Sequence, residues 1–237
     1  MPLDFELLDH RSTSMGELTL RRRREPVLDV EVYEVKLGDE FLMSSLFTAA
    51  ERALATLGLA GIDGDGPLDV LVGGLGLGYT AAEALTDSRI AALHVIEALE
   101  PVIGWHQRQL IPDTRQLADD PRCSLVHADF FAVASGDDPF APNVPMRHHA
   151  VLLDIDHSPS HHLHPSHGSF YSRDGLSRFA RRLHPGGVFA MWSDGDPDDV
   201  FVAILGTVFT STELHRVTFP NPYTGSESSS TVYVAVL

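Results

Sequence analysis

The sequence is poor in cysteine and contains no long apolar run. Its single cysteine, Cys123, excludes an internal disulfide and a cage of cysteine thiolates around a metal within one chain. No apolar run approaches the roughly 20 residues that a membrane helix needs. The N-terminal stretch MPLDFELLDHRSTS is acidic and polar, whereas a signal peptide is basic and then apolar. We therefore expect a cytoplasmic protein that does not bind a membrane.

Basic residues are also scarce. Lysine and arginine together number 17 against 33 acidic residues, which gives a formal net charge of −16. This charge repels the phosphates of nucleic acids and favours a cationic or neutral small molecule. The arginines at 21–24 form the one basic block, but they continue an alternating β-like run, so we interpret them as an exposed strand end. The composition thus predicts a small-molecule partner and no nucleic acid.

Hydrophobic periodicity divides the 237 residues into a short β segment and one α/β domain. Two β-like runs, 16–23 and 27–38, predict an N-terminal hairpin or meander within residues 1–43. In residues 44–237, strands alternate with helices, which predicts a parallel, doubly wound sheet covered on both faces. Two final β-like runs follow each other without a helix, so the last strand is expected to be antiparallel. The expected strands lie at 68–74, 92–97, 123–128, 149–155, 188–193, 213–219 and 230–237, and the main helices at 44–59, 79–85, 101–110, 173–183 and 198–209.

Glycines are concentrated after the first strand of this domain. The run VLVGGLGLGYTAAEAL places Gly73, Gly74, Gly76 and Gly78 between a strand and a helix. Glycine at such a turn lets a nucleotide-like ligand approach the backbone closely. A tight turn without a ligand would explain the glycines equally well, so the pattern needs support from other strand ends.

Carboxylates at the ends of the next two strands supply that support. Glu97 follows about twenty residues on, where a carboxylate can hydrogen-bond a ribose diol. Asp129 ends the third strand, where it can meet an adenine amino group, and Phe130 directly after it is assigned to the same pocket. Three features at successive strand ends predict an adenosine-type cofactor.

Two cofactors fit this pattern. Gly76, Gly78 and Ala81 satisfy the dinucleotide GxGxxA form, so an NAD oxidoreductase stays an alternative. The closing pair of strands favours instead the seven-stranded sheet of S-adenosylmethionine-dependent transferases.

Several segments together resemble the spermidine synthase-like proteins, which share the S-adenosylmethionine methyltransferase fold. They are VLVGGLGLG, HVIEALEPVI, DPRCSLVHADFF, HAVLLDIDHSP and LHPGGVFAMWS, in this order. The resemblance covers about residues 40–237 and makes the N-terminal β segment similar to a shortened version of the family's β domain. It implies that Gly74, Gly76 and Gly78 line the methionine side of the cofactor, that Glu97 holds the ribose and that Asp129 reads the adenine. It also suggests a homodimer.

The chain departs from the aminopropyltransferases of this family at the acids that hold the polyamine. Those enzymes carry one acid where Gly76 stands and a second at the position of His157, with Asp156 one residue away. Methyl transfer from S-adenosylmethionine to a small-molecule acceptor, with an amine as one candidate, is therefore the leading hypothesis. Aminopropyl transfer from decarboxylated S-adenosylmethionine is the first alternative, and a non-catalytic nucleoside-binding protein is the second.

A histidine-rich loop, DIDHSPSHHLHPSH, follows the fourth strand of the domain. Asp154 ends this strand and is assigned to the cofactor pocket, where it faces the expected reactive end of the cofactor. We predict that Asp154, Asp156 and His157 are catalytic, because they can position an acceptor amine or hydroxyl and take its proton.

The same loop raises the question of a metal site. Its five histidines and two aspartates supply suitable ligand types. However, Pro159 and Pro165 break any helix that would align an i, i+4 pair, and neither an HExxH motif nor a cysteine-based signature is present. We expect no metal here and expect solvent exposure for His162 and His164.

Overall fold

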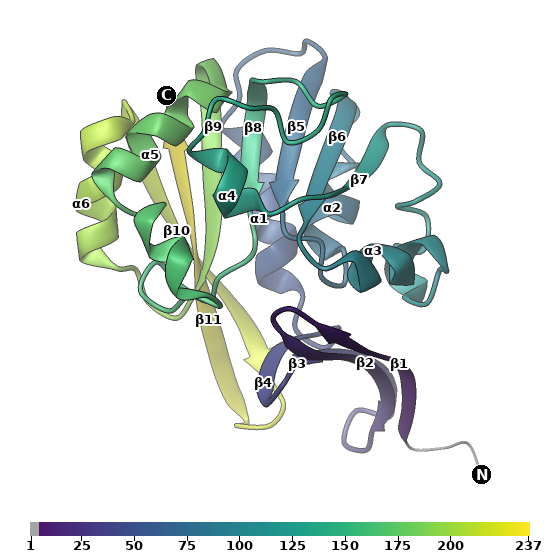
Figure 1. The fold of residues 1–237 in the computed structure, drawn as a ribbon. Helices are drawn as coiled ribbons and strands as arrows, with labels where there is room; N and C mark the ends of the chain where they lie inside the picture. Colours follow the sequence, from purple (N-terminus) through teal and green to yellow (C-terminus); the bar gives the residue numbers. More distant parts are fainter. Residues whose placement is uncertain (1–4) are drawn as a thin grey trace.

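The structure, a computed structural model, describes residues 5–237, which form two β-sheets and the helices around them (Figure 1). The smaller sheet is an antiparallel meander in the order β1-β2-β3-β4. Its strands are β1 (Phe5–Thr13), β2 (Gly16–Glu25), β3 (Val30–Leu37) and β4 (Glu40–Ser44). The sequence predicted only β2 and β3. β1 is mostly exposed and therefore shows no apolar alternation, and β4 has only five residues.

The larger sheet has seven strands in the order β10-β11-β9-β8-β5-β6-β7. The strands are β5 (Leu68–Gly73), β6 (Ile90–Glu97), β7 (Cys123–His127), β8 (His148–Leu153), β9 (Leu183–Asp194), β10 (Ser211–Asn221) and β11 (Ser226–Val236). The pairs among β5 to β9 are parallel, and β11 is antiparallel to both of its neighbours. The predicted seven-stranded sheet with an antiparallel last strand is therefore confirmed. An NAD oxidoreductase would be favoured by a parallel last strand, whereas the last strand here is antiparallel.

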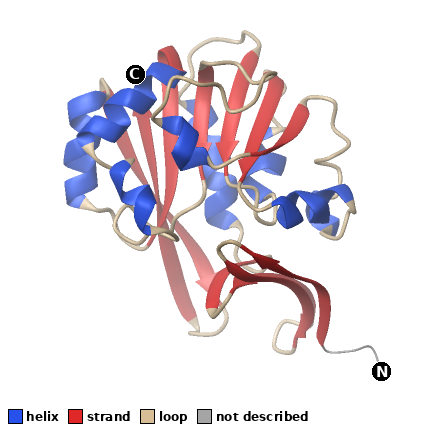
Figure 2. Ribbon diagram, in the orientation of Figure 1, coloured by secondary structure: helices blue, strands red, loops and turns tan. Residues whose placement is uncertain are grey.

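Helices cover both faces of this sheet (Figure 2). One face carries α1 (Ala49–Ala60), α2 (Tyr79–Ala84) and α3 (Glu100–Gln107), and the other carries α4 (Phe130–Ala134), α5 (Arg173–Phe179) and α6 (Asp199–Val208). Short 3-10 turns lie at Pro112–Thr114, Pro165–Ser169 and Ala180–Arg182. The helix expected over 173–183 ends early because this last turn tightens before β9 begins, and the helix expected from 44 starts later because Ser44 still pairs within the smaller sheet.

The two faces bury separate apolar cores. The core on the α4–α6 side is rich in phenylalanine and includes Phe130, Phe179 and Phe201. The core on the α1–α3 side includes Leu54 and also takes in Leu18, Leu20, Val35 and Leu37 from the smaller sheet. Burying each such side chain contributes about 1.5–3 kcal/mol, so the inner face of the smaller sheet is held firmly against the larger domain.

The long β10–β11 hairpin reaches the smaller sheet as well (Figure 1). Tyr223, in its turn, donates its hydroxyl to Glu25 at 2.8 Å, and Arg23 donates to the same hydroxyl at 2.9 Å. Phe47 packs against Phe219 and Tyr223. None of the helices within residues 5–237 has the length and apolar character needed to cross a membrane.

Candidate active site

A cavity of about 520 Å³ lies at the carboxyl ends of the central parallel strands. Gly74, Glu97, Asp129 and Asp154 line it, each just at or after the end of one of β5 to β8. The smaller sheet and its first turn supply an apolar wall that consists of Met15, Leu18, Val35, Leu37, Leu42 and Met43. The volume falls within the roughly 300–1,000 Å³ typical of small-molecule sites.

The glycine loop bends with positive φ at three positions: Gly74 (95°), Gly76 (46°) and Gly78 (86°). A β-carbon on Gly74 would overlap the carbonyl oxygen of Asp154, and one on Gly76 would overlap the sulfur of Met43. Only glycine therefore allows the loop backbone to lie this close to Asp154 and Met43. Of the four predicted glycines, Gly74 and Gly76 line the cavity.

Gly73 and Gly78 do not line the cavity and have structural roles. Gly73 leaves room for the ring of Phe130, and Gly78 leaves room for His106 and Leu117. Gly78 also occupies the N-cap position of α2 in the left-handed conformation. These two glycines let the loop pack closely against the side chains of its neighbours.

Glu97 fixes the glycine loop. Its carboxylate accepts the backbone N–H of Leu75 at 3.0 Å and that of Leu99 at 2.8 Å, so it ties the loop to the end of β6. Burial raises the pKa of Glu97, and these N–H groups partly offset the effect because they stabilise the charged form. The side chain lines the cavity, where a carboxylate matches the hydroxyl donors of a ribose diol.

Asp129 lies at the end of the cavity formed by α4. Its Oδ1 accepts the backbone N–H of Ala132 at 3.1 Å and so caps the helix. Its Oδ2 has no hydrogen-bond donor within residues 5–237 and the side chain is exposed to the cavity. Phe130 lies beneath it in the core and also borders the cavity.

Asp154 and Glu51 form a pair of carboxyl groups on the cavity wall. Thr80 lies between the two residues: its hydroxyl donates to Oδ2 of Asp154 at 2.6 Å and lies 3.3 Å from the backbone carbonyl oxygen of Glu51. Burial raises the pKa of both groups, and the charge of Asp154 raises the pKa of Glu51 further. Such a pair retains a proton at a pH where isolated carboxyl groups are fully charged.

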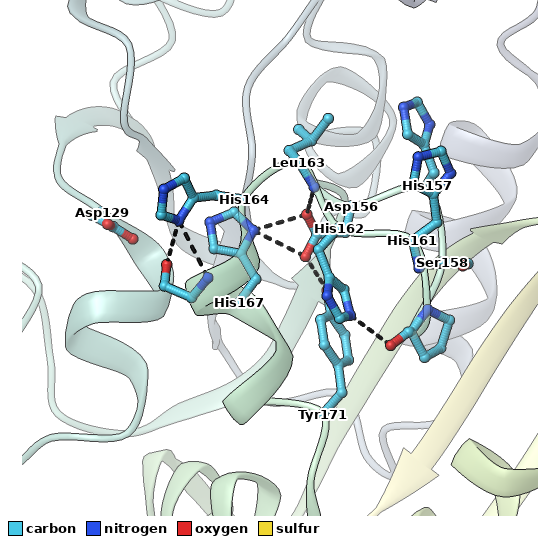
Figure 3. A network of polar contacts seen from close by, with 12 residues as sticks. Asp129, Asp156, His157, Ser158, His161, His162, Leu163, His164, His167 and Tyr171 are labelled. Carbon is cyan, nitrogen blue, oxygen red and sulfur yellow. Dashed lines mark hydrogen bonds and ion pairs between the residues drawn. The ribbon is translucent and has the colours of Figure 1, made fainter. Parts of the chain in front are cut away.

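The residues of the histidine loop, drawn in Figure 3, divide into those that line the cavity and those that do not. His157 lines the cavity and lies 3.1 Å from Glu40. Asp156, predicted to contact the acceptor, does not line it. Its carboxylate is fully buried and accepts hydrogen bonds from Leu163, His167 and Tyr171, so it is turned into the loop and not toward a ligand.

The two histidines expected to be simply exposed have defined surroundings. His162 is half-buried and stacks on Tyr171 at 5.0 Å between ring centroids, and its Nε2 lies 2.6 Å from the carbonyl oxygen of Pro159. His164 is exposed as predicted, but it borders the cavity. The prediction for His162 is therefore wrong, and that for His164 is incomplete.

Three residues that line the cavity were not predicted from the sequence as part of the site. Glu51 has the sequence position of an ordinary acid in the first turn of a helix. Met43 looks like a core residue at the end of a strand. His167 is one of five histidines in a single loop, and only its buried place beside Phe131 distinguishes it.

Known proteins share this architecture. No protein-family model and no curated protein matches the sequence. Among solved structures, a spermidine synthase in complex with the transition state analogue AdoDATO has a TM-score of 0.74 at 16% identity and covers 97% of this chain and 73% of its own.

Two further structures are similar. The spermidine synthase from Thermotoga maritima has a TM-score of 0.71 at 16% identity, over 97% of this chain and 72% of its own. Human methyltransferase-like protein 13, in complex with SAH, has a TM-score of 0.56 at 18% identity, over 79% and 82%. At these identities the similarity establishes the fold, and the chain accordingly has a spermidine synthase-like fold of the kind also found in a methyltransferase-like protein.

Proposed function

We propose that this protein is a transferase that moves the methyl group of S-adenosylmethionine to a small amine. The observation that carries the proposal is the charge of the cavity. Four carboxyl groups line it, those of Glu51, Glu97, Asp129 and Asp154, and no lysine or arginine does so among the residues that the structure describes. A sulfonium cofactor and an ammonium acceptor are both cations, so both suit this lining.

The cavity also fits the cofactor in shape. The loop at Gly74 and Gly76 has no room for a side chain, so its backbone forms the cradle for the methionine part. Glu97 would accept hydrogen bonds from the ribose hydroxyls. Asp129, with a free oxygen, would accept a hydrogen bond from the amino group of adenine. Similar structures in complex with AdoDATO and SAH support this assignment.

When bound, S-adenosylmethionine supplies a methyl carbon on a positively charged sulfur, which leaves as a neutral thioether with the C–S electron pair while the amine lone pair forms the new bond. An amine has this lone pair only after it has lost its proton. Asp154, whose pKa is raised by burial and whose Oδ2 accepts the hydroxyl of Thr80, would accept that proton and hold the acceptor in place. His157, on the same wall, would orient the acceptor.

A second function, aminopropyl transfer, is favoured by one observation. S-adenosylmethionine carries a carboxylate that the decarboxylated form lacks, and the described cavity lining has no basic side chain to pair with it. Against this candidate, the space above Gly76, where the aminopropyltransferases carry an acid, is filled by the sulfur of Met43. We therefore rank it second.

Calorimetric titration with S-adenosylmethionine, its decarboxylated form and S-adenosylhomocysteine separates the candidates. We expect the first and third to bind, and Glu97→Gln to weaken both by tenfold or more, as expected when a hydrogen-bonded carboxylate is lost. Glu100→Gln is the matched control, because Glu100 is exposed and does not line the cavity. Binding of the decarboxylated form alone would make aminopropyl transfer the function.

A turnover assay completes the test. We expect S-adenosylhomocysteine to form in the presence of a panel of primary and secondary amines, and Asp154→Asn to abolish this while its cofactor affinity stays within about threefold. Cofactor binding without product from any amine would indicate a non-catalytic nucleoside-binding protein.

A further inference from the structure

His167 holds a well-defined place on the cavity wall. Its side chain is only 8% exposed, and its ring lies nearly parallel to that of Phe131, with 3.9 Å between the centroids. Both residues line the cavity. Phe131 follows Asp129 by two residues, so His167 belongs to the end of the cavity that Asp129 marks. Figure 3 shows His167 between Asp156 on one side and His164 and Asp129 on the other.

Asp156 fixes the tautomer of this ring. Nδ1 of His167 lies 2.8 Å from Oδ1 and 3.1 Å from Oδ2 of Asp156. The carboxylate also accepts the backbone N–H of Leu163 at 2.8 Å and the hydroxyl of Tyr171 at 2.7 Å. A buried carboxylate with donors on both oxygens acts as an acceptor only, so Nδ1 of His167 carries the hydrogen.

In the neutral imidazole with hydrogen on Nδ1, the other ring nitrogen has a lone pair. Nε2 of His167 has no hydrogen-bond partner in the described part of the chain, and it is not sealed from the cavity. The free Oδ2 of Asp129 is a second acceptor on the same end of the cavity. Both acceptors line the same cavity, whose wall there includes the ring of Phe131, and together they match a group that donates two hydrogens.

We propose that His167 selects the base of the bound nucleoside: its Nε2 and Oδ2 of Asp129 each accept one hydrogen of the exocyclic amine of adenine. This inference rests on the proposed function, because it requires a nucleoside cofactor in the cavity. Hypoxanthine has an oxygen in place of that amine and would set a third acceptor against the two on the wall. His167 is thus a specificity-determining residue, and Asp156 is the residue that positions it.

Calorimetry with S-adenosylhomocysteine and S-inosylhomocysteine tests this directly. We expect the native protein to prefer the adenine compound by about 100-fold, on the order of tenfold for each hydrogen bond. His167→Phe keeps a ring against Phe131 but removes the acceptor, so the preference should fall to about tenfold, through weaker binding of the adenine compound. His161→Phe is the matched control, because this histidine is exposed, lies on the same loop and does not line the cavity.

A second measurement does not depend on any variant folding. In the native protein, the ¹⁵N resonances of the His167 ring should show hydrogen on Nδ1 and a lone pair on Nε2, and only Nε2 should shift on addition of S-adenosylhomocysteine.

Three results would overturn the proposal. A preference that His167→Phe leaves unchanged would show that His167 does not read the base, while the proposed function would stand. Hydrogen on Nε2 of His167 in the free protein would also show that His167 does not accept from the base, and the proposed function would again stand. If neither S-adenosylhomocysteine nor S-adenosylmethionine binds the native protein, the proposed function fails together with this inference.

Discussion

The sulfur of Met43 fills the space that a β-carbon on Gly76 would occupy, and the same sulfur accepts the backbone N–H of Leu77 at 3.1 Å. Met43 belongs to β4 and Gly76 to the loop after β5, so the contact joins the two sheets at the edge of the cavity. The smaller sheet therefore completes the glycine loop, and changes on either side of the contact should depend on each other.

We expect Gly76→Ala to weaken binding of S-adenosylhomocysteine by about tenfold and to lower the free energy of unfolding by about 1 kcal/mol. The φ of 46° is unfavourable for alanine, and the new methyl group would push Met43 into the cavity. In a Met43→Ala background, the binding loss should shrink to threefold or less, since the space is then free. Calorimetry on the four proteins checks this, and equal losses in both backgrounds would contradict it.

Asp156→Ala should destabilise the protein by roughly 3 kcal/mol or more, because it leaves three buried donors without an acceptor. Tyr171→Phe should cost only about 1 kcal/mol, since Asp156 keeps two of its donors. Urea unfolding at neutral pH measures both. A loss for Asp156→Ala no larger than that for Tyr171→Phe would mean that the network does not hold the loop.

The parts of the site that follow from strand order could be predicted. Gly74, Glu97, Asp129 and Asp154 are all at or just after the ends of parallel strands, and such ends meet at one edge of a sheet. Local sequence was sufficient, because each residue is placed by the strand that precedes it.

The rest depends on contacts between distant segments. Asp154 and Asp156 would point the same way if the strand continued, but β8 ends at Leu153 and the chain turns, so their carboxylates separate. Glu51 reaches the cavity through the packing of α1 beside α2, with Thr80 of α2 between it and Asp154. Neither the turn nor the helix packing leaves a periodic signal in the sequence.

Stability should fall in acid because of His148, at the start of β8. Its ring is fully buried, and neither ring nitrogen has a partner within residues 5–237. Burial, with nearby cationic groups that include His94 and Arg182, lowers the pKa of His148 to about 3. The unfolded chain binds a proton near its ordinary pKa of about 6.5, so the free energy of unfolding decreases as the pH falls below that value.

We expect His148→Leu to remove about 2 kcal/mol of the loss in stability between pH 7.5 and pH 5, since each pH unit below 6.5 contributes about 1.4 kcal/mol. Urea unfolding at the two pH values measures this, with His161→Leu, at an exposed histidine, as the control. A loss in His148→Leu as large as in the native protein would place the acid sensitivity elsewhere.

The pair Glu51 and Asp154 should have the opposite effect on stability. Both pKa values are raised in the folded protein, so the native state retains protons that the unfolded chain releases above about pH 4. The free energy of unfolding should therefore decrease as the pH rises from 5 to 8. Glu51→Gln should reduce this decrease by on the order of 1–2 kcal/mol, as measured by urea unfolding in ligand-free protein. An unchanged slope would show that Glu51 does not retain an extra proton in the folded protein.

The contact of Tyr223 with Glu25 has a consequence for how tightly the cavity is closed. The hairpin holds one end of the smaller sheet, whereas a ligand in the cavity would touch the other side of that sheet through residues such as Met15 and Leu37. Hairpin and ligand therefore act on the same local opening equilibrium. Backbone amides of β2 and β3 should exchange their hydrogens with solvent more slowly when ligand is bound and faster in Tyr223→Phe, so a side chain outside the cavity contributes to ligand affinity.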